Sequence, residues 1–171
     1  MNPTLRNGIL VGLLWVMTTS AMAQRAILSD APSPRQDYEL NLEMRPEAVI
    51  QSIQMLLSDR GAALPPVTGY LPGFDVRLDT RRFVGQNVRI FLRLPTAIPG
   101  VENISGIELT WEASGQWLAG SVSPGQEALL YEGIINEAVT GGVLNLVLTI
   151  SSGSANDFFS IEPIYEVEVI S

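Results

Sequence analysis

Short segments in which apolar and polar residues alternate are the feature that most restricts what this sequence can fold into. In residues 143–151 (VLNLVLTIS), every second position from 144 to 150 is Leu or Ile, and residues 74–79 (FDVRLD) and 87–94 (NVRIFLRL) alternate in a similar way. Successive side chains of a strand point to opposite faces, so a period of two indicates half-buried β-strands. Further segments of this kind lie at residues 106–112, 127–135 and 163–171. With turn-forming residues between them, they predict an all-β, antiparallel sandwich of about seven or eight short strands.

Glycine and proline mark the connections that we expect between these strands. Residues 62–73 (AALPPVTGYLPG) are predicted to be a loop, and residues 140–142 (TGG) a turn. Residues 49–57 (VIQSIQMLL) fit both the apolar stripe of a helix and most of one face of a strand. We favour a strand there, because every later segment has the pattern of a strand.

One alternating segment stands apart from the rest, near the N-terminus. In Tyr38–Met44 (YELNLEM) the apolar residues share one face, and these residues are Tyr38, Leu40, Leu42 and Met44. A polar stretch with prolines (SDAPSPRQD, residues 29–37) precedes it and is predicted to be unstructured, while Pro46 ends it. The apolar face has to be buried either in the chain's own sheet or in a groove of a neighbouring chain. The pattern alone does not decide between these two possibilities.

Residues 1–23 have the composition of a secretory signal peptide. Arg6 supplies a positive charge, residues 8–16 (GILVGLLWV) form a short apolar run, and residues 21–23 (AMA) form a small-x-small cleavage site. The apolar run is shorter than the ~20 residues that a membrane-spanning helix needs, which disfavours an uncleaved anchor. We therefore expect an exported chain with a flexible leader and a strand at residues 24–45, followed by one β-sandwich domain at residues 46–171.

The composition restricts the chemistry that the chain can perform. It contains no cysteine and no histidine, and all ten of its basic residues are arginine. Disulfides, zinc sites, Ser–His triads and thiol chemistry are therefore excluded. The 18 carboxylates give a net charge of −8, which makes a nucleic acid an unsuitable partner. We predict that the protein is not an enzyme and has no catalytic residue, cofactor or metal site.

Two sets of residues suggest a site but have a simpler interpretation. Glu112 and Glu132 are candidates for the carboxylate pair of a glycosidase, yet nothing in the sequence sets their separation, and exposed strand positions explain them. Trp111, Trp117 and Tyr131 are candidates for a platform on which a sugar stacks. We interpret them instead as aromatic residues of the core or of a groove.

The order of the segments resembles that of one known family. A strand followed by proline (LNLEMRP) precedes an aliphatic run into a turn (IQMLLSDRGAALP). Paired strands (GFDVRLDT and VRIFLRL), a strand that ends in tryptophan (IELTW), an aliphatic strand (VLNLVLTIS) and a terminal strand (IYEVEVIS) follow. In this order, and in its lack of cysteine, the chain resembles the major pilins of alpha-class (class 5) chaperone–usher fimbriae, the colonization-factor antigen type.

The resemblance implies an incomplete immunoglobulin-like β-sandwich that is completed by a strand donated by a neighbouring subunit. By this resemblance Tyr38–Met44 is the donor strand, and Tyr165, Val167 and Val169 of the last strand form the edge of the acceptor groove. The sequence ends about one residue after that strand, so we expect no further strand to cover its free edge.

The function that the resemblance implies is structural. A subunit of this family polymerises head to tail into a surface filament that supports adhesion. The implied partners are neighbouring subunits, a periplasmic chaperone, an outer-membrane usher and a tip adhesin, and the protein would pass through the periplasm to the cell surface. The alternative is a self-contained, secreted β-sandwich that binds carbohydrate or protein.

Overall fold

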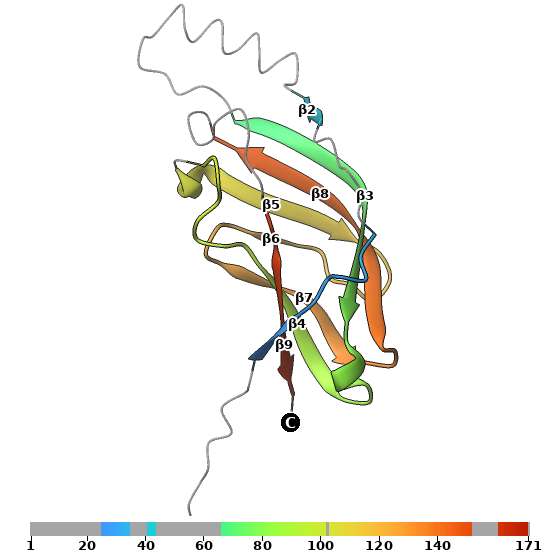
Figure 1. Cartoon of the computed structure of the whole chain (residues 1–171). Helices are drawn as coiled ribbons and strands as arrows, with labels where there is room; N and C mark the ends of the chain where they lie inside the picture. Colours follow the sequence, from blue (N-terminus) through green and yellow to red (C-terminus); the bar gives the residue numbers. More distant parts are fainter. Residues whose placement is uncertain (1–24, 35–40, 44–65, 102, 152–160, 171) are drawn as a thin grey trace, which may run out of the picture.

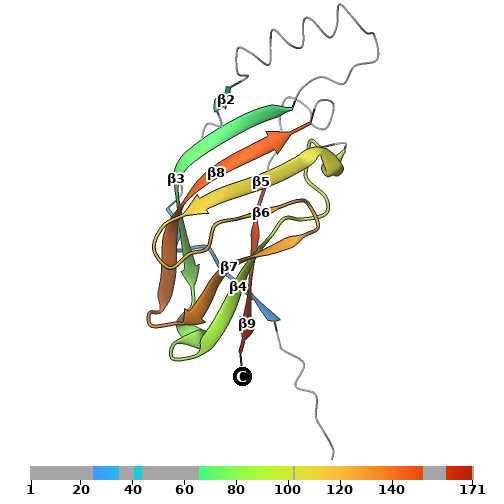
Figure 2. The same cartoon turned by 180° about the vertical axis from the view of Figure 1, so that it is seen from behind.

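The described residues form two antiparallel β-sheets that pack face to face (Figures 1 and 2). The structure is a computed structural model that describes residues 25–34, 41–43, 66–101, 103–151 and 161–170. Within these ranges the helical elements are the short 3-10 helices η1 (Arg81–Phe83) and η2 (Ile104–Gly106). The signal peptide predicted for residues 1–23 and the strand favoured for residues 49–57 lie outside the described residues.

The strand order identifies the kind of sandwich. One sheet, called here the β9 sheet, contains in spatial order β1 (Arg25–Leu28), β9 (Ile164–Val169), β4 (Asn87–Arg93) and β7 (Glu127–Ile134). The other, the β8 sheet, contains β2 (Asn41–Glu43), β3 (Val67–Asp79), β8 (Val139–Ile150), β5 (Ile107–Ala113) and β6 (Gly120–Val122). The order β2-β3-β8-β5 matches strands A, B, E and D of an immunoglobulin domain, and β9 and β4 match strands F and C. The predicted all-β, antiparallel, immunoglobulin-like β-sandwich is therefore confirmed, and β1 occupies the position of strand G.

Alternate residues of the strands fill the space between the sheets. In β8 the side chains of Leu144, Leu146 and Leu148 are buried, whereas those between them are wholly or partly exposed. The same alternation in β4 buries Val88, Ile90 and Leu92 against them. The period of two read from the sequence is thus confirmed as the core-facing pattern of these strands.

The aromatic residues lie inside this core. Trp111, Trp117 and Tyr131 are all buried, which confirms their interpretation as core residues. The indole N–H of Trp111 donates to the carbonyl oxygen of Leu118 at 2.8 Å, and that of Trp117 donates to the carbonyl oxygen of Gly141 at 2.9 Å. Each buried indole therefore keeps a hydrogen-bond partner, as a buried donor requires.

Two connections predicted from glycine and proline are wrong, because the residues belong to long paired strands. The second half of the predicted loop at residues 62–73 forms the start of β3, and residues 140–142 lie near the start of β8. The two strands pair from Val67↔Ile150 to Asp79↔Val139, with a bulge between Leu71 and Phe74 that accommodates Pro72 and Gly73.

Close packing, rather than a turn, explains the glycines of β8. A Cβ atom on Gly142 would lie 2.6 Å from Cδ1 of Trp117, so only glycine leaves room for the indole ring.

Candidate functional site

The N-terminal segment, residues 25–34, covers the edge of β9. Its strand β1 runs antiparallel to β9 with Arg25 opposite Glu168 and Leu28 opposite Tyr165. In Figure 1 this segment, in blue, leaves β1 beside the red β9 and crosses toward the green β3. The flexible leader predicted from residue 24 onward is therefore wrong for residues 25–28. The free edge of β9 offers a row of unpaired backbone groups, and pairing with it orders even a very short strand.

One side chain carries most of the apolar contact of β1. Leu28 is 5% exposed and belongs to the hydrophobic core, whereas its neighbour Ile27 is 73% exposed. Burying a leucine side chain contributes ~1.5–3 kcal/mol. Leu28 is thus the one side chain of β1 that is buried in the core, and its burial contributes only a small free energy to the docking of a strand that completes a sheet.

Beyond β1 the N-terminal segment contacts the other sheet. The carbonyl oxygen of Ser29 accepts a hydrogen bond of 2.9 Å from the backbone N–H of Asp79 in β3. Ser33 Oγ accepts from the backbone N–H of Arg77 at 2.8 Å and donates to its carbonyl oxygen at 3.0 Å. The segment therefore bridges β9 and β3, and it closes the side of the sandwich between these two strands.

On the outer face of the β9 sheet, Arg25 contacts a group of side chains from three strands. Its Nε donates to Glu168 at 3.2 Å, its Nη1 forms a hydrogen-bonded ion pair with Glu127 and lies 3.8 Å from Glu166, and its guanidinium carbon lies 4.4 Å from the ring centre of Phe91. The hydrogen bond to Glu127, together with the nearby carboxylate charges, raises the pKa of Arg25 above its ordinary value. We call Phe91, Glu127, Glu166 and Glu168 the acidic–aromatic cluster.

The residues predicted to edge the acceptor groove lie on β9, between β1 and β4. Tyr165 and Val167 are buried and face the core, while Val169 is half-buried. Burial raises the pKa of the Tyr165 hydroxyl well above its ordinary value, and the charge of Asp30 adds to this effect. These residues therefore lie beside the covering strand, and their role in accepting a strand from a neighbour stays a prediction.

The predicted donor strand lies elsewhere in this chain. Its central residues form β2, whose backbone pairs with β3, so that Asn41 lies opposite Tyr70 and Leu42 opposite Gly69. Tyr38, Leu40 and Met44 lie outside the described residues. Within the single chain the middle of Tyr38–Met44 thus pairs in the β8 sheet, and the edge of β9 is covered by β1, which the sequence analysis missed. The sequence of β1, RAIL, gives no strand signal of this kind, because Ala26, Ile27 and Leu28 are consecutive apolar residues and do not alternate with polar ones.

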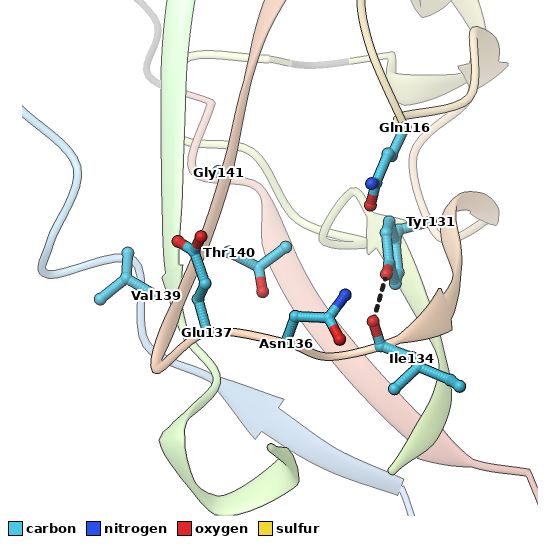
Figure 3. A pocket seen from close by; sticks show the side chains of 8 residues that line it. All are labelled: Gln116, Tyr131, Ile134, Asn136, Glu137, Val139, Thr140 and Gly141. Atoms are coloured by element: carbon cyan, nitrogen blue, oxygen red, sulfur yellow. Dashed lines mark hydrogen bonds between the residues drawn. The ribbon is translucent and has the colours of Figure 1, made fainter. Parts of the chain in front are cut away.

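A small polar pocket lies between the start of β8 and the end of β7 (Figure 3). It has a volume of about 200 Å³, and the residues that line it are Gln116, Tyr131, Ile134, Asn136, Glu137, Val139, Thr140 and Gly141. The Tyr131 hydroxyl donates to the carbonyl oxygen of Ile134 at 3.0 Å, as the dashed line shows. Amides, a carboxylate and a hydroxyl suit hydrogen bonding to a small polar molecule.

The carboxylates considered as a glycosidase pair lie in different sheets. Glu112 belongs to β5 and Glu132 to β7, and both side chains are exposed. Glu132 forms an ion pair of 2.9 Å with Arg89. This placement agrees with the interpretation of both residues as exposed strand positions.

Neither a metal cluster nor a membrane-spanning helix is found in the part of the chain that the structure describes. In comparisons with known proteins, no family model matches the chain, and no curated protein or solved structure is significantly similar to it.

Proposed function

We propose that this protein is a structural fimbrial subunit that polymerises by exchanging its N-terminal strand. The observation that carries the proposal concerns the strand that covers β9. This strand, in the position of strand G, comes from the other end of the described chain, and Leu28 is its one side chain that is buried in the core. A strand that is short, peripheral and far in sequence from its partner is suited to moving to the same edge of another molecule.

Exchange between copies preserves the contacts that β1 makes within one chain. The backbone hydrogen bonds of an added strand do not depend on which molecule supplies it, and the pocket for Leu28 is the same in every copy. Swapping an identical element is accordingly a low-cost route to association. When each copy gives its strand to the next, the contact does not close on itself and builds a filament.

The sequence supports the same proposal. The order of its strands resembles that of alpha-class pilins, and residues 1–23 have the composition of a signal peptide. In this proposal a periplasmic chaperone covers the edge of β9 before assembly, an outer-membrane usher adds subunits, a tip adhesin ends the filament, and the filament is displayed on the cell surface.

Variants of the full chain, expressed with its own leader, test the proposal and identify the donor. We expect Leu28→Asp to abolish polymers measured by size-exclusion chromatography and electron microscopy, because a carboxylate cannot replace the buried side chain. Ile27→Asn is the control, since Ile27 points to solvent and an uncharged side chain adds no negative charge opposite Glu166, and it should polymerise like the wild type.

The same experiment separates β1 from the donor predicted by the resemblance. If Leu42→Asp abolishes polymers while Leu28→Asp does not, Tyr38–Met44 is the donated strand and β1 is not. If the wild-type chain stays monomeric both alone and when it is co-expressed with a chaperone and usher, the proposed polymerisation is wrong.

A self-contained binding module is the second candidate function, and the polar pocket of Figure 3 favours it. The side chains of Gln116, Asn136 and Thr140 offer donors and acceptors that match the hydroxyl groups of a sugar. Titration of the labelled protein with monosaccharides, followed by NMR, tests this candidate. Saturable shifts at these residues that are lost in Asn136→Ala support it, and their absence across neutral, amino and acidic sugars contradicts it.

A further inference from the structure

We propose that the acidic–aromatic cluster is a recognition site for an arginine on the strand that covers β9, and that it selects β1 of a second copy of this chain as the exchanged strand. The inference rests on the proposed function, and it adds the feature that determines which strand is accepted and in which register. In the single chain, the guanidinium of Arg25 contacts Glu127, Glu166, Glu168 and the Phe91 ring.

Arg25 and Leu28 together define the register of β1. Leu28 points into the core opposite Tyr165, and Arg25 points to the outer face opposite Glu168. A slip of one residue would turn both side chains to the wrong face. A slip of two residues would move the guanidinium by about 6.6 Å along the strand, opposite Glu166 in one direction and beyond Glu168 in the other, and it would move Leu28 away from its place opposite Tyr165. An arginine followed three positions later by leucine therefore fits this edge in one register.

The chemistry of the cluster suits arginine better than lysine. A planar guanidinium can lie over the Phe91 ring and still direct its N–H groups to carboxylates beside the ring. Lysine has a compact ammonium group and cannot make the stacked contact and the separate hydrogen bonds at once. We therefore expect the site to distinguish the two cations as well as to require a positive charge.

The charge of the cluster also discriminates between the two candidate strands. Arg93 forms an ion pair of 2.9 Å with Glu166, and Arg89 pairs with Glu132. When β1 leaves, Glu127 and Glu168 lose the ion pairs that they make with Arg25, and the outer face becomes more negative. A strand with an outward arginine is attracted to this face.

Tyr38–Met44 would be repelled by the same face. With its apolar residues turned to the core, its outward residues would be Glu39, Asn41 and Glu43. Like charges directly opposite each other on a sheet are destabilising. Charge complementarity thus favours β1 over Tyr38–Met44 as the strand that pairs with β9 in the filament.

A charge-swap experiment with full-length chains tests the inference. One chain carries Arg25→Glu, and the other carries Glu166→Arg and Glu168→Arg. Because the contacts of Arg25 are partly exposed, we expect each chain alone to assemble about 5- to 30-fold more slowly than the wild type. An equimolar mixture should assemble at close to the wild-type rate, since each strand then meets a cluster of opposite charge.

Three further variants make the result specific. Arg81→Glu changes an exposed arginine that pairs with Asp79 outside the cluster, and it should assemble normally. Arg25→Lys should fall between the wild type and Arg25→Glu, because it keeps the charge but not the stacked geometry. Arg25→Gln, which introduces no repulsion, replaces Arg25→Glu if thermal unfolding shows that the latter is not folded, and it should also slow assembly.

The outcomes separate this inference from the proposed function. If Arg25→Glu or Arg25→Gln assembles as fast as the wild type, or if the mixture assembles no faster than its components, the arginine is not recognised and the inference is wrong, although strand exchange stands. If the wild type does not assemble at all, the proposed function is wrong and the inference about a second copy fails with it.

Discussion

Replacing Leu28 by alanine tests how weakly β1 is held. The side chain is 5% exposed, so the substitution removes apolar groups that are almost fully buried. At ~0.8 kcal/mol for each buried methylene-sized group, the loss is about 2–2.5 kcal/mol. Because β1 lies at the edge of the sheet and can detach, we expect this cost in the docking of β1 rather than in the unfolding of the whole domain.

Hydrogen exchange measures this docking directly. Detachment of β1 exposes its own amides and those amides of β9 that point to β1, so the amides of residues 25–28 and the β1-facing amides among residues 165–168 report on it. A loss of about 2–2.5 kcal/mol corresponds to exchange that is about 30- to 60-fold faster at these amides. Amides in the centre of β8 should change little, because that strand does not contact β1 through the backbone.

Ile27→Ala is the matched control for this prediction. Ile27 is the preceding residue on the same strand and is 73% exposed, so its truncation should cost less than ~0.5 kcal/mol. If both substitutions accelerate exchange equally, the anchoring role of Leu28 is refuted. If Leu28→Ala leaves the amides of β1 unchanged, β1 is held by contacts other than the core.

Two further substitutions test the core and the buried edge of β9. Gly142→Ala would place a Cβ atom 2.6 Å from Trp117 and should lower the free energy of unfolding by ~1–3 kcal/mol in denaturant titration, and an unchanged midpoint would contradict the packing described here. Burial raises the pKa of Tyr165, so the folded state keeps this proton when the unfolded chain, with a tyrosine pKa of about 10, has lost it. The contribution of Tyr165 to the free energy of unfolding is therefore fully present below about pH 10. Above that pH it falls by at most ~1.4 kcal/mol per pH unit. Tyr165→Phe should remove this part of the alkaline loss of stability, and an identical pH dependence in the variant would refute it.

The sandwich could be predicted from sequence because its long strands alternate regularly. In β8 the leucines at every second position marked the buried face correctly. The same reasoning was wrong for the glycines at residues 141 and 142. A glycine required by close packing, against the Trp117 ring for Gly142 and against β3 for Gly141, looks in sequence like a glycine required by a turn. Only the contact between distant residues distinguishes the two.

That β1 covers the edge of β9 could not be predicted from the sequence either, and here the physical reason is different. Arg25–Leu28 contains a single buried anchor, and its order comes from pairing with residues 165–168, at the other end of the chain. Tyr38–Met44 alternates more clearly, and the sequence therefore favours it over Arg25–Leu28 as the strand that pairs with the edge of β9. Its described part also forms a strand, β2, but this strand pairs with β3. The alternation was therefore sufficient to predict a strand there and insufficient to predict its partner.

Chemical cross-linking between copies tests the exchange of β1 most directly. The chain has no cysteine, so one full-length chain with Ala26→Cys and another with Val167→Cys each carry a single thiol. These residues lie opposite each other, and opposed Cα atoms of antiparallel strands are about 4.5–5.5 Å apart, a separation that a disulfide can bridge. Pairing Ala26→Cys with Ser121→Cys, on the distant strand β6, is the control.

The two chains are mixed, assembled, oxidised and separated by electrophoresis without reductant. We predict disulfide-linked dimers with Val167→Cys and none with Ser121→Cys. If the assembled mixture yields no linked dimers, while a chain that carries both Ala26→Cys and Val167→Cys closes its disulfide only within itself, β1 stays on its own subunit and the proposed exchange is wrong.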